Sequence, residues 1–164
     1  MQPFSYQDGE LYCENVPVAK LAEQHGTPVW IYSKSFILGQ LKQIQTAFAE
    51  VDPVICYSVK ANSNQAVLKT LAGLGAGMDV VSEGELRRAL AAGVQPAKIT
   101  FSGVGKTQAE MAFALAHDIL CFNVESEPEL ALLSAEQALG HRQTLLGNRV
   151  LLAQQSAPLT PICL

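Results

Sequence analysis

Lys60 is the residue whose position could support covalent chemistry. It directly follows the apolar run Val54–Val59, at the carboxyl end of a predicted strand, and a strand's period of two places it on the same side as Cys56 and Ser58. If that side faces the interior of a barrel, desolvation lowers the pKa of the amine, which can then attack an aldehyde to form an imine. The alternative is a lysine that has left the strand and reaches water, and the spacing alone favours this alternative.

Two acidic residues could assist such chemistry. Asp79 lies within the apolar segment Gly77–Ser82, where a carboxylate needs a partner; a neighbouring strand end that carries Lys60 would provide one. Glu85 stands three residues after Ser82, which is the spacing of a helix capping box. Capping is the preferred explanation for Glu85, ahead of a role in chemistry.

The segment Ser102–Thr107 resembles a phosphate-binding loop because it reads SGVGKT and precedes a helical pattern. The nucleotide-binding pattern, however, requires a glycine where this chain has Thr100. The sequence therefore argues against a nucleotide site, although glycines at a helix N-terminus could still receive a phosphate.

Apolar stretches alternate with segments of helical spacing along the chain. The near-continuous apolar character of these stretches is typical of parallel strands covered on both faces; they are residues 29–32, 54–59, 78–81, 99–101 and 119–124. Helical spacing follows the first stretch, at Ile37, Leu41, Ile44, Phe48 and Val51, and the second, at Val67, Leu68, Leu71 and Leu74.

Capping-box spacings mark the starts of the later helices, at Ser82/Glu85, Thr107/Glu110 and Ser126/Glu129. Each follows a predicted strand, so the pattern predicts an α/β fold of about five β/α units with a parallel sheet. The sheet could be open and doubly wound or part of a (β/α)8 TIM barrel. The 164 residues are too few to close a barrel, which needs at least roughly 200.

Composition excludes several classes of protein. With 49% apolar residues, 16% charged residues and a net charge of −4, the chain is neither disordered nor suited to nucleic acid. It has no signal-peptide pattern and no apolar run of the roughly 18–20 residues that a membrane span needs, so we expect a cytoplasmic protein. The cysteines and histidines show no spacing for a metal site, and Cys56 and Cys121 lie in apolar runs that predict buried thiols.

The C-terminal residues depart from the repeat. All Asp and Glu lie at or before Glu136, and the tail HRQTLLGNRVLLAQQSAPLTPICL has no capping signal. We therefore divide the chain into an N-terminal segment (1–26), a partial β/α barrel (27–139) and an aberrant tail (140–164). A natural terminus and a lost reading frame are equally good explanations of the tail.

The motifs CYSVKANSN, GMDVVSEGEL, ITFSGVGKT and LCFNVESEPEL occur in the order found in the diaminopimelate decarboxylase family. The chain resembles the N-terminal part of that family, which belongs to the fold-type III, alanine-racemase-like enzymes that use pyridoxal 5'-phosphate. The resemblance covers residues 10–140. It implies a partial pyridoxal-binding barrel in which Lys60 forms the imine with the cofactor, with Asp79 and Glu85 nearby.

The resemblance also implies the reaction, which is decarboxylation of meso-2,6-diaminopimelate to L-lysine. The cofactor performs the difficult step, and the protein orients the bond that breaks. In this family the site forms between two subunits, so self-association is implied as well.

Several features of the family have no counterpart here: the histidine that stacks on the cofactor ring, the glycine-rich phosphate loop, the acid at the ring nitrogen, and the β domain with its cysteine and tyrosine. We therefore expect a truncated chain with little or no activity. Two alternatives stay open. One is another fold-type III protein, such as an amino-acid racemase or a different basic amino-acid decarboxylase; the other is a non-catalytic remnant that acts as a binding module.

Overall fold

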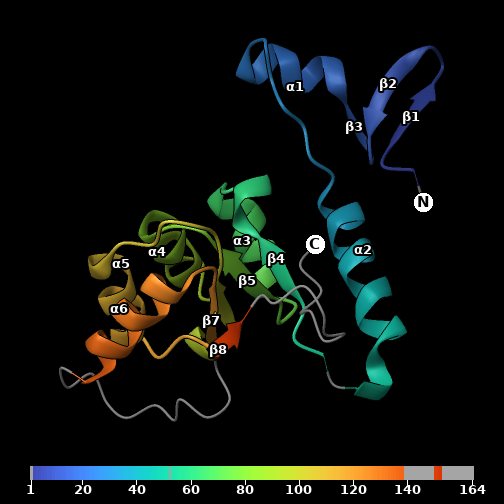
Figure 1. Ribbon diagram of the computed structural model, residues 1–164. Coiled ribbons are helices and arrows are strands. Elements are labelled where there is room, and N and C mark those ends of the chain that lie inside the picture. Colours follow the sequence, from blue (N-terminus) through green and yellow to red (C-terminus); the bar gives the residue numbers. More distant parts are fainter. Residues whose placement is uncertain (1, 52, 139–149, 153–164) are drawn as a thin grey trace. The chain divides into compact units, whose positions relative to one another are not determined.

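The computed structural model describes residues 2–51, 53–138 and 150–152 (Figure 1). The chain divides into two compact units, Met1–Glu50 and Val51–Leu164. Within the described ranges, no helix combines the length and apolar character needed to cross a membrane.

The N-terminal unit begins with a β-hairpin. Strands β1 (Phe4–Gln7) and β2 (Glu10–Cys13) pair antiparallel, and the short strand β3 (Val16–Pro17) pairs with β2. Asp8 and Gly9 link β1 to β2 with φ values of 51° and 82°, the conformation of the two-residue turn that suits the twist of a hairpin. Two helices follow, α1 (Val18–His25) and α2 (Lys34–Ala47).

The strand predicted at residues 29–32 is wrong. This segment belongs to no strand, and Trp30 and Tyr32 are 85% and 56% exposed. An apolar run becomes a strand only where the edge of another strand can pair with it. The helix predicted after it is confirmed as α2, with Leu41 buried and Phe48 as its C-cap, whereas Val51 lies beyond the helix in the 3₁₀ turn η1 (Ala49–Val51).

The second unit contains a parallel sheet. Its strands are β4 (Cys56–Ser58), β5 (Gly77–Val80), β6 (Ile99–Phe101), β7 (Cys121–Val124) and β8 (Val150–Leu152). They lie in the order β4-β5-β6-β7-β8, so each strand pairs with its predecessor. A doubly wound sheet reverses its order at a switch point, whereas a barrel does not. The sheet therefore confirms the incomplete (β/α)8 barrel.

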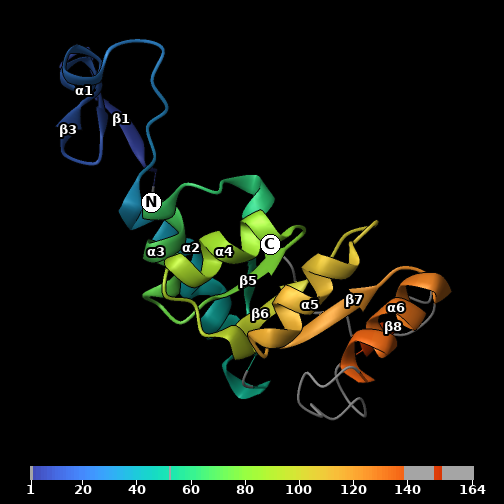
Figure 2. The same cartoon turned by 90° about the vertical axis from the view of Figure 1, so that its left-hand side faces the viewer.

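Helices and short 3₁₀ turns connect these strands: η2 (Val59–Ala61), α3 (Gln65–Ala72), α4 (Glu83–Ala91), η3 (Pro96–Lys98), α5 (Gln108–Ala116) and α6 (Glu127–Ala138). Figures 1 and 2 show α4 and α5 on the same side of β5 and β6. Fully buried apolar side chains from strands and helices form the core, among them Met78, Val80, Ile99, Phe101, Leu68, Leu86 and Met111. Cys56 and Cys121 are also buried, as predicted.

Strand β8 lies inside the range 140–164 that the sequence analysis sets apart as a tail. It pairs in parallel with β7, with Phe122 opposite Val150. The other residues of that range lie outside the described part of the chain, so the boundary at residue 140 stays a prediction.

Candidate functional site

A row of polar residues crosses neighbouring strands of the parallel sheet. Ser58 of β4 is opposite Asp79 of β5, and Asp79 is opposite Thr100 of β6. Paired residues of a parallel sheet point to the same face, so the three side chains share one side of the sheet. All three are buried. Because ligands bind at the carboxyl ends of barrel strands, this row lies where a site is expected.

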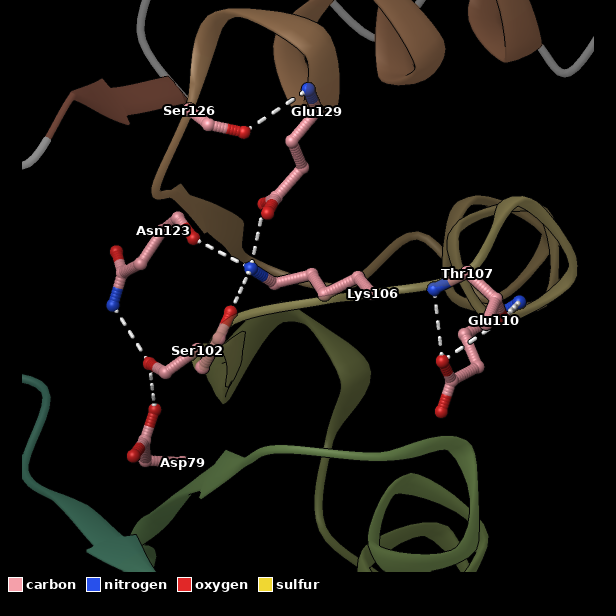
Figure 3. Close-up of polar contacts among 9 residues, drawn as sticks. Asp79, Ser102, Lys106, Thr107, Glu110, Asn123, Ser126 and Glu129 are labelled. Carbon is pink, nitrogen blue, oxygen red and sulfur yellow. Dashed lines mark hydrogen bonds and ion pairs between the residues drawn. The ribbon is translucent and has the colours of Figure 1, made fainter.

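Asp79 is held by hydroxyl groups. Its Oδ1 accepts hydrogen bonds from Thr100 Oγ1, at 2.9 Å, and from Ser102 Oγ. Asn123 Nδ2 in turn donates to Ser102 Oγ at 2.8 Å, which completes a chain of donors directed at the carboxylate (Figure 3). A buried carboxylate needs such donors to offset its desolvation. The prediction that Lys60 is its partner is therefore corrected: the partners are hydroxyls from β6 and the loop after it.

Lys60 does not continue strand β4. The strand ends at Ser58, and Val59–Ala61 forms the 3₁₀ turn η2. A 3₁₀ helix has about three residues per turn, so the period of two no longer applies beyond Ser58. Val59 is fully buried, whereas Lys60 is exposed. Of the two alternatives for Lys60, the structure agrees with the one that spacing alone favours, a lysine that has left the strand, and not with a buried lysine.

Glu85 acts at the start of α4, although not quite as a capping box requires. Ser82 Oγ accepts a hydrogen bond from the Glu85 amide at 3.3 Å, as predicted. The Glu85 carboxylate, however, accepts from the amide of Val81 at 2.9 Å instead of that of Ser82. One carboxylate oxygen is therefore used to fix the end of β5.

Lys106 is buried and fully partnered. Its Nζ donates to the carbonyl oxygens of Gly103 and Asn123, at 2.6 and 2.8 Å, and to Glu129 Oε1 at 2.7 Å (Figure 3). An ammonium group has three protons, so none is left for a phosphate. This geometry agrees with the sequence argument against a nucleotide site.

The pairing with Lys106 also changes the predicted capping box at Ser126. The Glu129 amide donates to Ser126 Oγ at 3.4 Å, but the Glu129 carboxylate binds Lys106. The box predicted at Thr107 is complete, because Thr107 Oγ1 accepts from the Glu110 amide and Glu110 Oε2 accepts from the Thr107 amide. Of the three predicted boxes, Thr107 alone has both reciprocal bonds.

Glu110 serves a second helix as well. Its Oε1 accepts a hydrogen bond at 3.1 Å from the amide of Glu83, the first residue of α4. The bond from the Thr107 amide, assisted by the Glu83 amide, the Thr107 hydroxyl and the charge of Lys106, holds the pKa of Glu110 below its usual range. Helix N-termini favour a negative charge of this kind.

No local sequence pattern marks Thr100, Ser102 or Asn123 as a hydrogen-bond partner in the site around Asp79. One signal was available for Thr100, which stands in the β/α unit after that of Asp79 at the matching strand position. Hydrogen bonds to Asp79 from other strands depend on the register of the sheet, and local spacing does not reveal it.

Comparison with known proteins agrees with the motifs. Residues 34–154 match the family described as pyridoxal-dependent decarboxylase, pyridoxal binding domain. Diaminopimelate decarboxylase from Vibrio cholerae is 54% identical over 135 residues, covering 82% of this chain and 32% of the relative. The enzyme of the same name from Pseudomonas aeruginosa is 51% identical over 133 residues, covering 81% of this chain and 32% of the relative.

Solved structures show the same fold. Diaminopimelate decarboxylase from M. jannaschii in complex with L-lysine superimposes with a TM-score of 0.81 at 33% identity, over 84% of this chain and 33% of that one. This chain therefore spans about a third of the length of the proteins it matches. The match over residues 34–154 shows that the chain belongs to the pyridoxal-dependent decarboxylase family, within the region described as the pyridoxal binding domain.

Proposed function

We propose that this chain is the pyridoxal-binding part of a diaminopimelate decarboxylase, a carboxy-lyase that converts meso-2,6-diaminopimelate to L-lysine and carbon dioxide. Relatives of that name are 54% and 51% identical to it. The observation that carries the proposal is the position of Lys60 directly after the carboxyl end of β4, next to the strand that holds Asp79.

The residues at the carboxyl ends of β4 and β5 fit pyridoxal 5'-phosphate. When bound, the cofactor supplies an aldehyde carbon and a ring that accepts electrons. Lys60 is exposed and offers an amine for the aldehyde. Asp79 offers a carboxylate fixed by two hydroxyls. The side-chain oxygen of Ser58 is buried and, within the described residues, has no hydrogen-bond partner. A polar atom of the ligand would supply the missing hydrogen bond.

We assign roles to these residues on that basis. Lys60 binds the cofactor covalently, and Asp79 provides a fixed negative charge beside it. Glu85 supports the site indirectly. Its carboxylate accepts a hydrogen bond from the amide of Val81 and so fixes the chain where β5 ends. Residues 1–164 alone should turn over substrate poorly, because the part of the chain that the structure describes forms a parallel sheet of 5 strands, whereas a closed barrel has eight.

The proposed setting follows from the same family. We propose that the substrate is a small amino acid and that neither a nucleic acid nor a membrane is a partner. We also propose that the protein works in the cytoplasm. Self-association is expected, because an open parallel sheet leaves strand edges that can pair with another chain.

Covalent labelling tests the role of Lys60. The chain is incubated with limiting pyridoxal 5'-phosphate, reduced with borohydride, and the modified lysine is located by peptide mass spectrometry. We expect Lys60 to be labelled ahead of Lys69, which is also exposed, on α3. Lys60→Ala should abolish the preferential labelling, and Lys69→Ala should leave it intact. Labelling spread evenly over exposed lysines would favour a remnant without a cofactor site.

Substrate assays then separate the enzyme classes. Slow release of carbon dioxide from meso-2,6-diaminopimelate, lost in Lys60→Ala, supports the decarboxylase. Release from ornithine or arginine but not from diaminopimelate would indicate another basic amino-acid decarboxylase. Racemisation of alanine without loss of carbon dioxide would indicate a racemase.

A further inference from the structure

Among the described residues, two buried side-chain oxygens have no hydrogen-bond partner: Ser58 Oγ, at the carboxyl end of β4, and Gln65 Oε1, in the first turn of α3. Only Ser58 belongs to the row of paired strand residues that contains Asp79. Ser58 is 8% exposed, and within the described residues its Oγ has no hydrogen-bond partner. Burying a hydroxyl without replacing its bonds to water costs free energy, so nearly all such groups are paired in folded proteins. An exception at a strand end is therefore a candidate contact for a ligand.

The other hydroxyls around it are already used. Thr100 and Ser102 both donate to Asp79 Oδ1, and Ser102 also accepts from Asn123. Ser58 is the direct neighbour of Asp79 in the sheet register, on the same face, yet it takes no part in this chain of donors. Its side chain thus borders the fixed carboxylate with one hydrogen bond still to make.

The position of Ser58 relative to Lys60 gives this hydroxyl a specific ligand. Ser58 is the last residue of β4 and Lys60 the second residue of the turn that follows. A molecule attached to Lys60 is consequently tethered two residues from the unpaired hydroxyl. The polar substituents of pyridoxal phosphate can accept a hydrogen bond there.

We propose that Ser58 is a positioning residue whose hydroxyl donates a hydrogen bond to pyridoxal phosphate bound at Lys60. The inference rests on the proposed function and adds a residue to it. The inference predicts two different effects of Ser58→Ala. The substitution should weaken cofactor binding, because it removes a contact to the ligand. It should not destabilise the unliganded chain, because the hydroxyl has no partner there among the described residues. A purely structural serine would lower the stability of the unliganded chain when replaced.

Affinity and unliganded stability are measured on the same variants of the 164-residue chain. Pyridoxal 5'-phosphate is titrated into wild type and Ser58→Ala, followed by its absorbance; thermal unfolding is recorded without it. We expect the affinity of Ser58→Ala to fall about tenfold, or about 1.4 kcal/mol, with unfolding at an equal or higher temperature. Ser58→Cys, which keeps the shape of the side chain but replaces the hydroxyl with a larger and weaker donor, should also bind more weakly. Thr100→Val is the matched control, because it removes a partnered hydroxyl of the same row and should unfold at a lower temperature.

Two results would overturn the inference. Equal affinity of wild type and Ser58→Ala, with Lys60-dependent binding intact, would remove Ser58 from the site and leave the proposed function standing. A lower unfolding temperature of unliganded Ser58→Ala would show that the hydroxyl already has a partner, such as a buried water. Failure of wild type to bind the cofactor through Lys60 would overturn both proposals together.

Discussion

Lys106 Nζ lies 2.7 Å from Glu129 Oε1, and both side chains are almost completely buried, at 1% and 7% exposure. The pair joins the loop after β6 to the first turn of α6, and the same ammonium group binds the carbonyl oxygens of Gly103 and Asn123. A buried ion pair is a modest source of stability, but removal of one partner leaves an uncompensated charge in the interior.

Lys106→Met should therefore destabilise the chain strongly. The expected loss is about 3–5 kcal/mol in the free energy of unfolding, measured by urea denaturation. Lys69→Met, at an exposed lysine of α3, is the control and should change stability by less than about 0.5 kcal/mol.

Replacement of both partners distinguishes the buried charge from lost packing. The double variant Lys106→Met/Glu129→Leu should recover most of the loss, because neither charge then remains unpaired. If the double variant is as unstable as the sum of the single ones, the pair is not coupled and the explanation by buried charge is wrong.

Asp79→Ala should destabilise the sheet, because it leaves the hydroxyls of Thr100 and Ser102 without an acceptor. Each unsatisfied hydroxyl costs about 1–3 kcal/mol. Combining Asp79→Ala with Thr100→Val should show a coupling of at least about 0.5 kcal/mol in a double-mutant cycle of urea denaturations. Strictly additive effects would contradict the hydrogen bond between the two residues.

Glu110 should make stability depend on acid pH. Its pKa is lowered in the folded chain, chiefly by the amide of Thr107, so the ionised form stabilises the fold above the unfolded pKa of about 4.3. This contribution is lost as the pH falls through the lower, folded pKa. Glu110→Gln should reduce the unfolding free energy at pH 7 and flatten its acid dependence, because the amides of Thr107 and Glu83 then lose their charged acceptor. Chemical denaturation between about pH 3 and about pH 7, a range that spans the ordinary pKa of glutamate, measures both the stability and its pH dependence.

Gly77→Ala should disrupt the pairing of β5 with its neighbours. A Cβ at Gly77 would collide with the carbonyl oxygen of Lys98 and lie 2.9 Å from Cys56 Sγ, so backbone as well as side chain must move. We expect a loss of at least about 1–3 kcal/mol by urea denaturation. Gly84→Ala is the matched control, because its nearest contact would be Ser82 Oγ at 3.8 Å. Equal stability of Gly77→Ala and wild type would refute the close approach.

Local sequence determined most of the second unit. The helices begin where Ser82 and Thr107 place a hydroxyl three residues ahead of a glutamate amide, and the strand Ile99–Phe101 has the predicted bounds. Caps and apolar runs act between residues a few positions apart, so they can be identified without knowledge of the fold. The candidate residues Lys60 and Asp79 were likewise found from their positions at strand ends.

Tertiary structure alone decided which groups meet. Residues 29–32 have strand character but belong to no strand. Strand β4 ends at Ser58, two residues before Lys60. The carboxylate of Glu129 binds Lys106, 23 residues away, instead of capping its own helix. Hydrogen-bond partners and burial depend on the register of strands that are distant in the chain. For that reason the donors of Asp79 and the unpaired hydroxyl of Ser58 came from the fold and not from the motifs.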